Sequence, residues 1–193
     1  MDGTLTVAGC IDFKRLRHRL AIPPGEDILN FVAAAADAAT AARRAAIVEE
    51  EEHLGLAKLA LMPDISALVS FAASRPALRL GLLTRNNAAA AEHTLGKLRE
   101  AGMRFDAALS REWAGGPPKP HPAALLHMAG EWGVAPGELC MVGDSLDDVA
   151  CGAAAGATAV LIGEGDEPGA RETAHHHVDS LTSLVALLQR EFQ

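Results

Sequence analysis

From about residue 64 to its end, the sequence alternates short apolar segments with longer stretches that carry helix signals. Four apolar segments end at a polar residue or a glycine: 78–84, 105–110, 139–144 and 157–163. Between the first two, residues 86–102 place Ala91, Leu95 and Leu98 on one helical face and end at a glycine. Because short strands that alternate with helices typically pair in parallel, this pattern predicts a three-layer α/β fold around a parallel sheet.

Residues 13–62 break the alternation. They contain no strand candidate, and residues 28–61 form an alanine-rich stretch that favours helix, with a break near Gly55. We therefore expect a helical insertion at 13–62 within a core made of residues 1–12 and 63–193.

The charge of the chain limits its partners. The formal net charge of −8 disfavours a nucleic-acid or anionic-membrane partner, because an acidic protein field repels phosphate groups. A phosphorylated ligand would have to be held by a few local cations. The acidic run from Glu49 to Glu52 is most simply interpreted as the solvated face of a helix.

The cysteine pattern predicts a reducing compartment. Cys10, Cys140 and Cys151 are an odd number without CxxC spacing, which favours free thiols over disulfides. The sequence also lacks a run of about 18 apolar residues that could span a membrane. We expect a soluble protein in the cytoplasm or the interior of an organelle.

The residues that bear chemistry stand in the opening turn or just after the expected strands. They are, in chain order, Asp2, Thr84, Arg85, Asn86, Lys119, Asp144 and Asp148. In an open parallel sheet, ligands bind outside the carboxyl ends of the strands. Hydroxyl, amide, cationic and carboxylate groups are therefore expected to converge on one edge of the sheet.

Four short motifs resemble those of the haloacid dehalogenase superfamily in type and order. They are DGT at 2–4, LLTRN at 82–86, PPKP at 117–120 and GDSLDD at 143–148. Each motif alone would be a weak signal, but four in order at the ends of expected strands are specific. The resemblance covers nearly the whole chain and is greatest to the phosphoglycolate phosphatase-like branch, which has a short helical cap between the first two motifs.

The resemblance implies a Mg²⁺-dependent phosphatase that hydrolyses a small phosphomonoester through an aspartyl-phosphate intermediate. In the family's pattern Lys119 gives a positive charge to the phosphate, while Thr84, Arg85 and Asn86 donate hydrogen bonds to it at the start of a helix. Asp2 is the general acid and base. The implied partner is a small phosphorylated substrate, without nucleic acid or membrane, and the protein is expected to be a monomer or a weak homodimer.

The metal site implied by the resemblance consists of oxygen ligands, which Mg²⁺ prefers. Asp144 would bind the metal, Asp148 would hold it directly or through a water, and Asp2 would contribute its backbone carbonyl. Asp147 is expected to be a surface or capping carboxylate. The adjacent His175, His176 and His177 are expected to be solvated in a polar loop, not to bind metal.

The first motif is shorter here than in the family, where the pattern is DxDGT. Asp2 matches the second aspartate, so the nucleophile would stand directly before Met1, and the apolar central strand that precedes the motif is also missing. Each buried backbone group left unsatisfied costs about 1–3 kcal/mol, against a total stability of about 5–15 kcal/mol. We expect residue 1 to be an internal methionine taken as the start, and a chain that begins there to show no significant turnover.

Other interpretations stay open at this point. The chain could be a true truncated form, or its first motif could lack the aspartate altogether. The protein could be an inactive relative that binds phosphate and metal, or a phosphosugar mutase that uses the same centre with a different cap. A dehalogenase is disfavoured because it needs no metal and typically lacks the aspartate that Asp2 represents.

Overall fold

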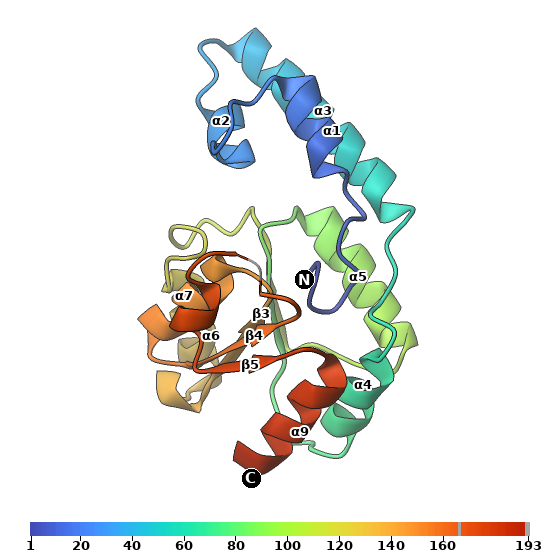
Figure 1. Cartoon of the computed structure of the whole chain (residues 1–193), viewed down its shortest axis with the longest axis vertical. Helices are drawn as coiled ribbons and strands as arrows, with labels where there is room; N and C mark the ends of the chain where they lie inside the picture. Colours follow the sequence, from blue (N-terminus) through green and yellow to red (C-terminus); the bar gives the residue numbers. More distant parts are fainter. Residues whose placement is uncertain (166, 192–193) are drawn as a thin grey trace. The chain divides into compact units, whose positions relative to one another are not determined.

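The computed structural model describes residues 1–165 and 167–191 (Figure 1). The chain divides into two compact units. The larger unit comprises Met1–Ala8 and Leu61–Gln193, and the smaller unit comprises Gly9–Ala60. The sequence pattern predicts the corresponding boundaries at residues 13 and 62. No helix in the described ranges combines the length and apolar character needed to cross a membrane.

The strands of the larger unit form two parallel sheets. One pairs β1 (Gly81–Leu83) with β2 (Ala107–Leu109), and the other has the order β3 (Cys140–Gly143), β4 (Thr158–Ile162), β5 (His176–Val178). In register, Leu82 lies opposite Ala108 and Val142 lies opposite Val160. The parallel α/β fold expected from the sequence is confirmed.

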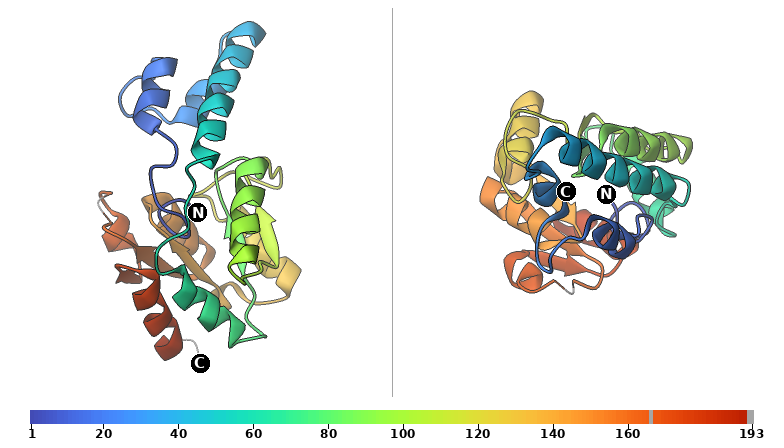
Figure 2. Two further views of the ribbon diagram at one scale, coloured as in Figure 1. Left: turned by 90° about the vertical axis from the view of Figure 1, so that its right-hand side faces the viewer. Right: turned by 90° about the horizontal axis from the view of Figure 1, so that it is seen from above.

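Helices precede, connect and follow these strands. They are α4 (Ile65–Ala73), α5 (Ala88–Glu100), α6 (Ala123–Trp132), α7 (Leu146–Ala155), α8 (Ala170–Thr173) and α9 (Leu181–Glu191), with the 3-10 turn η1 (Pro136–Glu138) before β3. Asn87 and Ser145 cap the first turns of α5 and α7 through their side-chain oxygens. Gly133 and Gly156 end α6 and α7 in the left-handed conformation. Helices α4 and α9 pack side by side (Figures 1 and 2).

Strand β4 shows why the fold has three layers. Its residues Val160 and Ile162 join the core formed with α4, α5 and α9, whereas Ala159 and Leu161 pack with α7 and α8. These four side chains are at most 1% exposed. A strand that is covered on both faces reads as a continuous apolar run, which is the pattern of residues 157–163.

Strands β1 and β3 are each at the end of a sheet and are not paired with each other in the described part of the chain. Leu82 of β1 and Val142 of β3 still belong to one apolar core. The single sheet expected from the sequence is therefore two sheets joined through side chains.

Strand β5 corrects one expectation. His176 lies in a strand that pairs with β4, opposite Val160, and is not in a solvated loop. His175 accepts a hydrogen bond from the Ala159 N–H through Nδ1, at 2.9 Å. The strand conformation of β5 comes from its pairing with the buried strand β4. The run of polar histidines does not by itself indicate a strand.

The smaller unit is helical, with α1 (Phe13–Leu20), α2 (Ile28–Ala33) and α3 (Ala38–Leu56). Asp12, Asp27 and Asp37 cap the three helices, each accepting a hydrogen bond from a first-turn N–H. The helix break expected near Gly55 is confirmed, because α3 ends at Leu56, and a further break separates α2 from α3. Gly55 lies in the last turn of α3, where an added Cβ would lie 2.8 Å from Ile11.

The acidic run in α3 is a solvated face only in its first half, because Glu49 and Glu50 are exposed. Glu51 is 1% exposed and Glu52 is 7% exposed. The Glu51 carboxylate accepts hydrogen bonds from Arg15 and Arg19 of α1, the shortest at 2.6 Å and 2.8 Å. Because Arg15 and Arg19 are four residues apart on one helix face, both reach the same carboxylate. These hydrogen bonds attach α1 to α3.

Candidate active site

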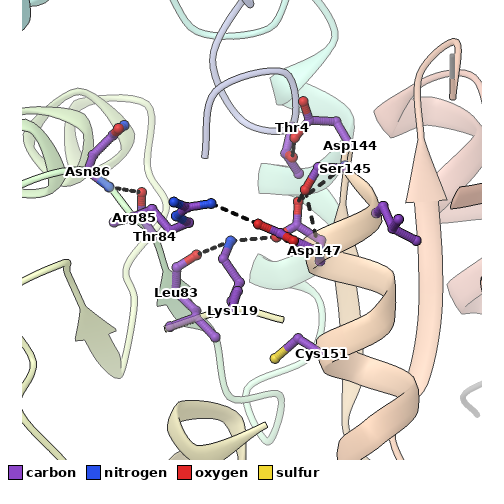
Figure 3. A network of polar contacts seen from close by, with 12 residues as sticks. Thr4, Leu83, Thr84, Arg85, Asn86, Lys119, Asp144, Ser145, Asp147 and Cys151 are labelled. Carbon is purple, nitrogen blue, oxygen red and sulfur yellow. Dashed lines mark hydrogen bonds and ion pairs between the residues drawn. The ribbon is translucent and has the colours of Figure 1, made fainter. Parts of the chain in front are cut away.

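Thr84 marks the carboxyl end of β1. Its N–H donates to the Leu109 carbonyl at 2.9 Å, and its side chain is buried. The Thr84 hydroxyl accepts a hydrogen bond from the Asn86 N–H at 3.1 Å (Figure 3). Asn87 then begins α5 by accepting from the Ala90 N–H at 2.8 Å. The turn between strand and helix thus holds the Thr84 hydroxyl at the sheet edge.

Lys119 connects the ends of the two sheets. Its Nζ lies 2.5 Å from Asp148 Oδ1 and 3.3 Å from the Leu83 carbonyl of β1 (Figure 3). The side chains of Lys119 and Asp148 are only 8% and 6% exposed. Burial acts to raise the pKa of Asp148, but the charge and hydrogen bond of Lys119 hold that pKa below its ordinary value. Lys119 is therefore a fixed cation, not a solvated loop lysine.

The GDSLDD motif builds the turn that presents Asp148. The Ser145 hydroxyl accepts from the Asp148 N–H at 3.3 Å, and Asp148 Oδ2 accepts from the Ser145 N–H at 3.3 Å, which together form a capping box at the start of α7. The Ser145 hydroxyl also donates to Asp148 Oδ2 at 2.7 Å. An added Cβ on Gly143 would lie 2.2 Å from Asp148 Cγ, so only glycine permits this approach. The geometry of this turn thus explains why the motif has Gly143, Ser145 and Asp148 at these positions.

Asp144 lies against the opening turn. Its Oδ1 accepts from the Thr4 hydroxyl at 3.0 Å, and a Cβ on Gly3, which has φ +71°, would lie 2.2 Å from its Oδ2. Burial raises the pKa of Asp144, and the charge of Asp148 adds to this effect. A half-buried carboxylate whose negative charge is disfavoured by its surroundings is suited to bind a cation.

Asp2 is held by two side chains. Its Oδ1 accepts from the Thr6 hydroxyl at 3.0 Å, and its Oδ2 accepts from the Asn86 amide at 2.6 Å. The Asn86 side chain therefore donates to Asp2, while the Asn86 backbone N–H donates to the Thr84 hydroxyl. The sequence predicts Asn86 as a phosphate ligand and carries no signal for this contact, because the two residues are 84 positions apart.

The metal ligands expected from the sequence, the Asp144 and Asp148 carboxylates and the Asp2 backbone carbonyl, stay a prediction. Among residues 1–165 and 167–191, no three His, Cys, Asp or Glu side chains are grouped to hold a metal ion, and the predicted set contains only two such side chains. The carboxylate of Asp148 contacts Lys119 and Ser145. Asp144 is a half-buried carboxylate whose donor chemistry fits Mg²⁺ as one oxygen ligand.

Arg85 and Asp147 form a second ion pair at this edge. Arg85 Nη1 lies 2.8 Å from Asp147 Oδ2, and Figure 3 shows Arg85 directed from the end of β1 toward Asp147 on α7. The expectation that Asp147 is only a surface or capping carboxylate is corrected by this contact. Sequence reasoning missed the pair, although an acidic residue beside Asp148 in the first turn of α7 would point to the same edge.

The sequence of this chain is similar to those of known hydrolases. Residues 1–156 match the family model of the haloacid dehalogenase-like hydrolases. The chain belongs to this hydrolase family. It is 35% identical over 210 aligned positions to a haloacid dehalogenase-like hydrolase domain-containing protein of Arabidopsis thaliana, covering 100% of this chain and 82% of that protein.

Two further similarities agree with the family. A phosphoglycolate phosphatase of Chromobacterium violaceum is 39% identical over 71 residues, which are 37% of this chain and 32% of that protein. The crystal structure of a hydrolase from Pseudomonas syringae superposes with a TM-score of 0.77 at 17% identity, covering 100% of this chain and 96% of that one. The similarity to phosphoglycolate phosphatases that the motifs indicate is confirmed, as is the Rossmann-like fold of the family's hydrolases.

Proposed function

We propose that this hydrolase is a Mg²⁺-dependent phosphatase that cleaves a small phosphomonoester through an aspartyl-phosphate intermediate. The observation that carries the proposal is the buried Lys119 Nζ, fixed 2.5 Å from Asp148 at the junction of the two sheets. The Thr84 hydroxyl and the Asp144 carboxylate belong to the same edge. A fixed cation with nearby donors stabilises the charge on phosphoryl oxygens throughout the transfer.

The reaction has two steps. A carboxylate oxygen attacks phosphorus, the P–O bond to the leaving group breaks, and Asp2 gives its proton to the leaving oxygen. A water then attacks the phosphorus of the aspartyl phosphate, Asp2 takes a proton from it, and the bond between phosphorus and the carboxylate oxygen breaks to release phosphate. Thr6 and Asn86 orient Asp2 for both proton transfers.

In the family's pattern DxDGT, the nucleophilic aspartate stands two residues before the position that Asp2 matches. The Met1 α-amino group is influenced by the charges of the site: desolvation and the charge of Lys119 lower its pKa, whereas the charges of Asp148 and Asp144 act to raise it. A residue joined to that nitrogen would therefore enter the site beside Lys119. Asp144 would hold Mg²⁺, which would supply charge neutralisation at the phosphoryl oxygens.

The test compares residues 1–193 with the same chain extended at its N-terminus by an apolar strand that ends in Asp, so that the junction reads Asp-Met-Asp-Gly-Thr. We expect the extended chain to hydrolyse 4-nitrophenyl phosphate with MgCl₂, and to lose that activity with EDTA or with Asp144→Ala. An extension that ends in Asn is the matched control and is expected to be inactive.

The 193-residue chain itself is expected to show no significant turnover. Robust turnover by that chain would contradict the assignment of the nucleophile. Absence of turnover by every extended form, with correct folding shown by circular dichroism, would contradict phosphatase function and favour a second candidate, a phosphate-binding relative without catalysis. That candidate needs only groups that can bind phosphate, such as the Lys119 ammonium and the Thr84 hydroxyl, which the described residues hold at the ends of the strands.

A further inference from the structure

The segment that carries Lys119 has few backbone donors. Residues 117–122, the lysine segment, read PPKPHP, and its four prolines have no backbone N–H. The N–H of His121 is used within the segment, where it donates to the Pro118 carbonyl at 3.0 Å. Attachment of the lysine segment to neighbouring elements therefore relies mainly on side chains and on carbonyl groups.

Helix α7 holds the lysine segment at two points. Asp148 Oδ1 lies 2.5 Å from Lys119 Nζ, and the Cys151 thiol donates to the His121 carbonyl with 3.6 Å between Sγ and the oxygen. Residues three apart on a helix share a face, and Figure 3 shows Cys151 on α7 below Lys119. One face of α7 thus contacts both the ammonium group of Lys119 and the backbone two residues later.

Cys151 is placed to act as a donor and as a spacer. The residue is 0% exposed, so water does not compete for its contact with the His121 carbonyl. Burial raises the pKa of the Cys151 thiol to about 11, so the thiol is protonated at neutral pH and keeps its S–H. Because a thiol is a weak donor, the volume of the sulfur also matters. Cys151 packs with Leu125 and Ala129 of α6, which close the space around it.

The position of the backbone matters for the Lys119 ammonium. A lysine side chain is a flexible stem, so its nitrogen keeps a constant position only when its backbone is held as well. The attraction between two charges falls with their separation. At the effective dielectric constant of a protein site, about 1 Å of added separation weakens a close ion pair by about tenfold.

We propose that Cys151 is a positioning residue of the candidate site, which holds the lysine segment against α7 so that the Lys119 ammonium stays at a fixed distance from the phosphoryl oxygens. The inference rests on the proposed function, because it takes the phosphoryl group to bind at Lys119. It gives a role in ligand binding to a buried side chain that touches no substrate.

The first measurement is the binding of inorganic phosphate, which does not depend on turnover. Isothermal titration of residues 1–193 with phosphate in the presence of MgCl₂ would compare the unchanged protein with two variants. Cys151→Ala should raise the Kd of phosphate by about tenfold, because the lysine segment loses its donor and its spacer. Cys151→Ser keeps a donor of similar size and should bind phosphate more tightly than Cys151→Ala.

Val149→Ala is the matched control. Val149 is also 0% exposed on α7, but it packs with Ala159 and Leu161 of β4 and not with the lysine segment. Its truncation should lower the free energy of unfolding at least as much as Cys151→Ala does, while the Kd of phosphate changes less than about twofold. A role of Cys151 in core filling alone predicts the same unchanged Kd for Cys151→Ala.

The second measurement observes Lys119 directly. Nuclear magnetic resonance of protein labelled with ¹⁵N at its lysines, with the signal of Lys119 assigned by its loss in Lys119→Met, reports the surroundings of the ammonium group without any ligand. We expect Cys151→Ala to shift this signal and Val149→Ala to leave it in place.

Two outcomes would overturn the inference and leave the proposed function standing. One is equal phosphate binding by the unchanged protein and by Cys151→Ala, with the Lys119 signal unmoved. The other is phosphate binding by Cys151→Ser as weak as that by Cys151→Ala, which would exclude the hydrogen bond as the means of positioning. Failure of the folded, unchanged protein to bind phosphate would instead remove the proposed function, whatever the position of the Lys119 signal.

Discussion

Asn86 Nδ2 lies 2.6 Å from Asp2 Oδ2, so a side chain at the end of β1 fixes the carboxylate of the opening turn. Asn86→Ala in the extended, Asp-containing chain should therefore lower kcat by about 10- to 100-fold, because small displacements of a catalytic group cost this much. KM should change little. Steady-state kinetics with 4-nitrophenyl phosphate would measure both constants.

The control for this variant is Asn87→Ala, which removes the cap of α5 one residue later. It should cost about 1 kcal/mol of stability and leave kcat nearly unchanged. Equal losses of kcat in the two variants would show that Asn86 acts only through the turn.

The buried ion pair between Lys119 and Asp148 should contribute measurably to the free energy of unfolding. Lys119→Met leaves the Asp148 carboxylate buried without its cation, and breaking a buried pair in this way costs about 3–5 kcal/mol. The double variant Lys119→Met/Asp148→Leu should lose less than the sum of the two single variants. Urea unfolding at pH 7 would measure the cycle, and additive losses would argue against direct coupling of the two residues.

Neutralising Asp144 should raise the stability of the protein, whereas removing the charge of Lys119 should lower it. Because burial raises its pKa in the folded state, Asp144 stabilises the fold only below its ordinary pKa and loses this contribution as pH rises through the folded value. Asp144→Asn should therefore raise Tm at pH 7 by a few degrees, since about 1 kcal/mol corresponds to roughly 2–4 °C in a domain of this size. Below the ordinary pKa of an aspartate the gain should vanish.

Magnesium provides the second measurement on Asp144. Differential scanning fluorimetry should show that MgCl₂ raises Tm of the unchanged protein and not of Asp144→Asn. A similar Mg²⁺ response in both proteins would place the metal elsewhere.

The contact between α1 and α3 should make the smaller unit acid-sensitive. Hydrogen bonds from Arg15 and Arg19 hold the pKa of Glu51 below its ordinary value of 4.5. A depressed pKa gives stability that is present above the ordinary value and is lost as pH falls through the folded value. We expect amide exchange in α1 and α3 to accelerate, after correction for intrinsic rates, as pH falls below about 4.5.

Glu51→Gln should remove this pH dependence and accelerate exchange in α1 and α3 already at neutral pH. Glu50→Gln is the matched control, because Glu50 is an exposed partner of Arg19 in the same helix. If the two variants behaved alike, the burial of Glu51 would not be the cause.

The sequence predicts the parallel fold and much of the candidate site because both depend on local patterns. Apolar runs such as residues 157–163, bounded by glycine or polar residues, are typical of strands covered on both faces, and the polar residues that follow parallel strands are expected to meet at one edge. Thr84, Lys119 and Asp144 are predicted in this way. Capping residues such as Ser145 likewise act within one turn of their own helix.

The features that sequence reasoning missed depend on contacts between distant elements. The buried position of Glu51 follows from two arginines on another helix, and the strand at His176 follows from pairing with β4. The contact between Asn86 and Asp2 joins residues 84 positions apart. No periodicity or local motif encodes such pairs, so the tertiary structure is needed to find them.

The separation of the two sheets determines how the larger unit is expected to unfold locally. No backbone ladder joins β1 to β3 in the described residues, so the two halves are coupled through shared apolar packing and through Lys119, Arg85 and their aspartates. Cooperative units in proteins follow such boundaries. The β1–β2 half and the β3–β4–β5 half are thus two potential foldons, and the groups proposed to bind phosphate lie at the boundary between them.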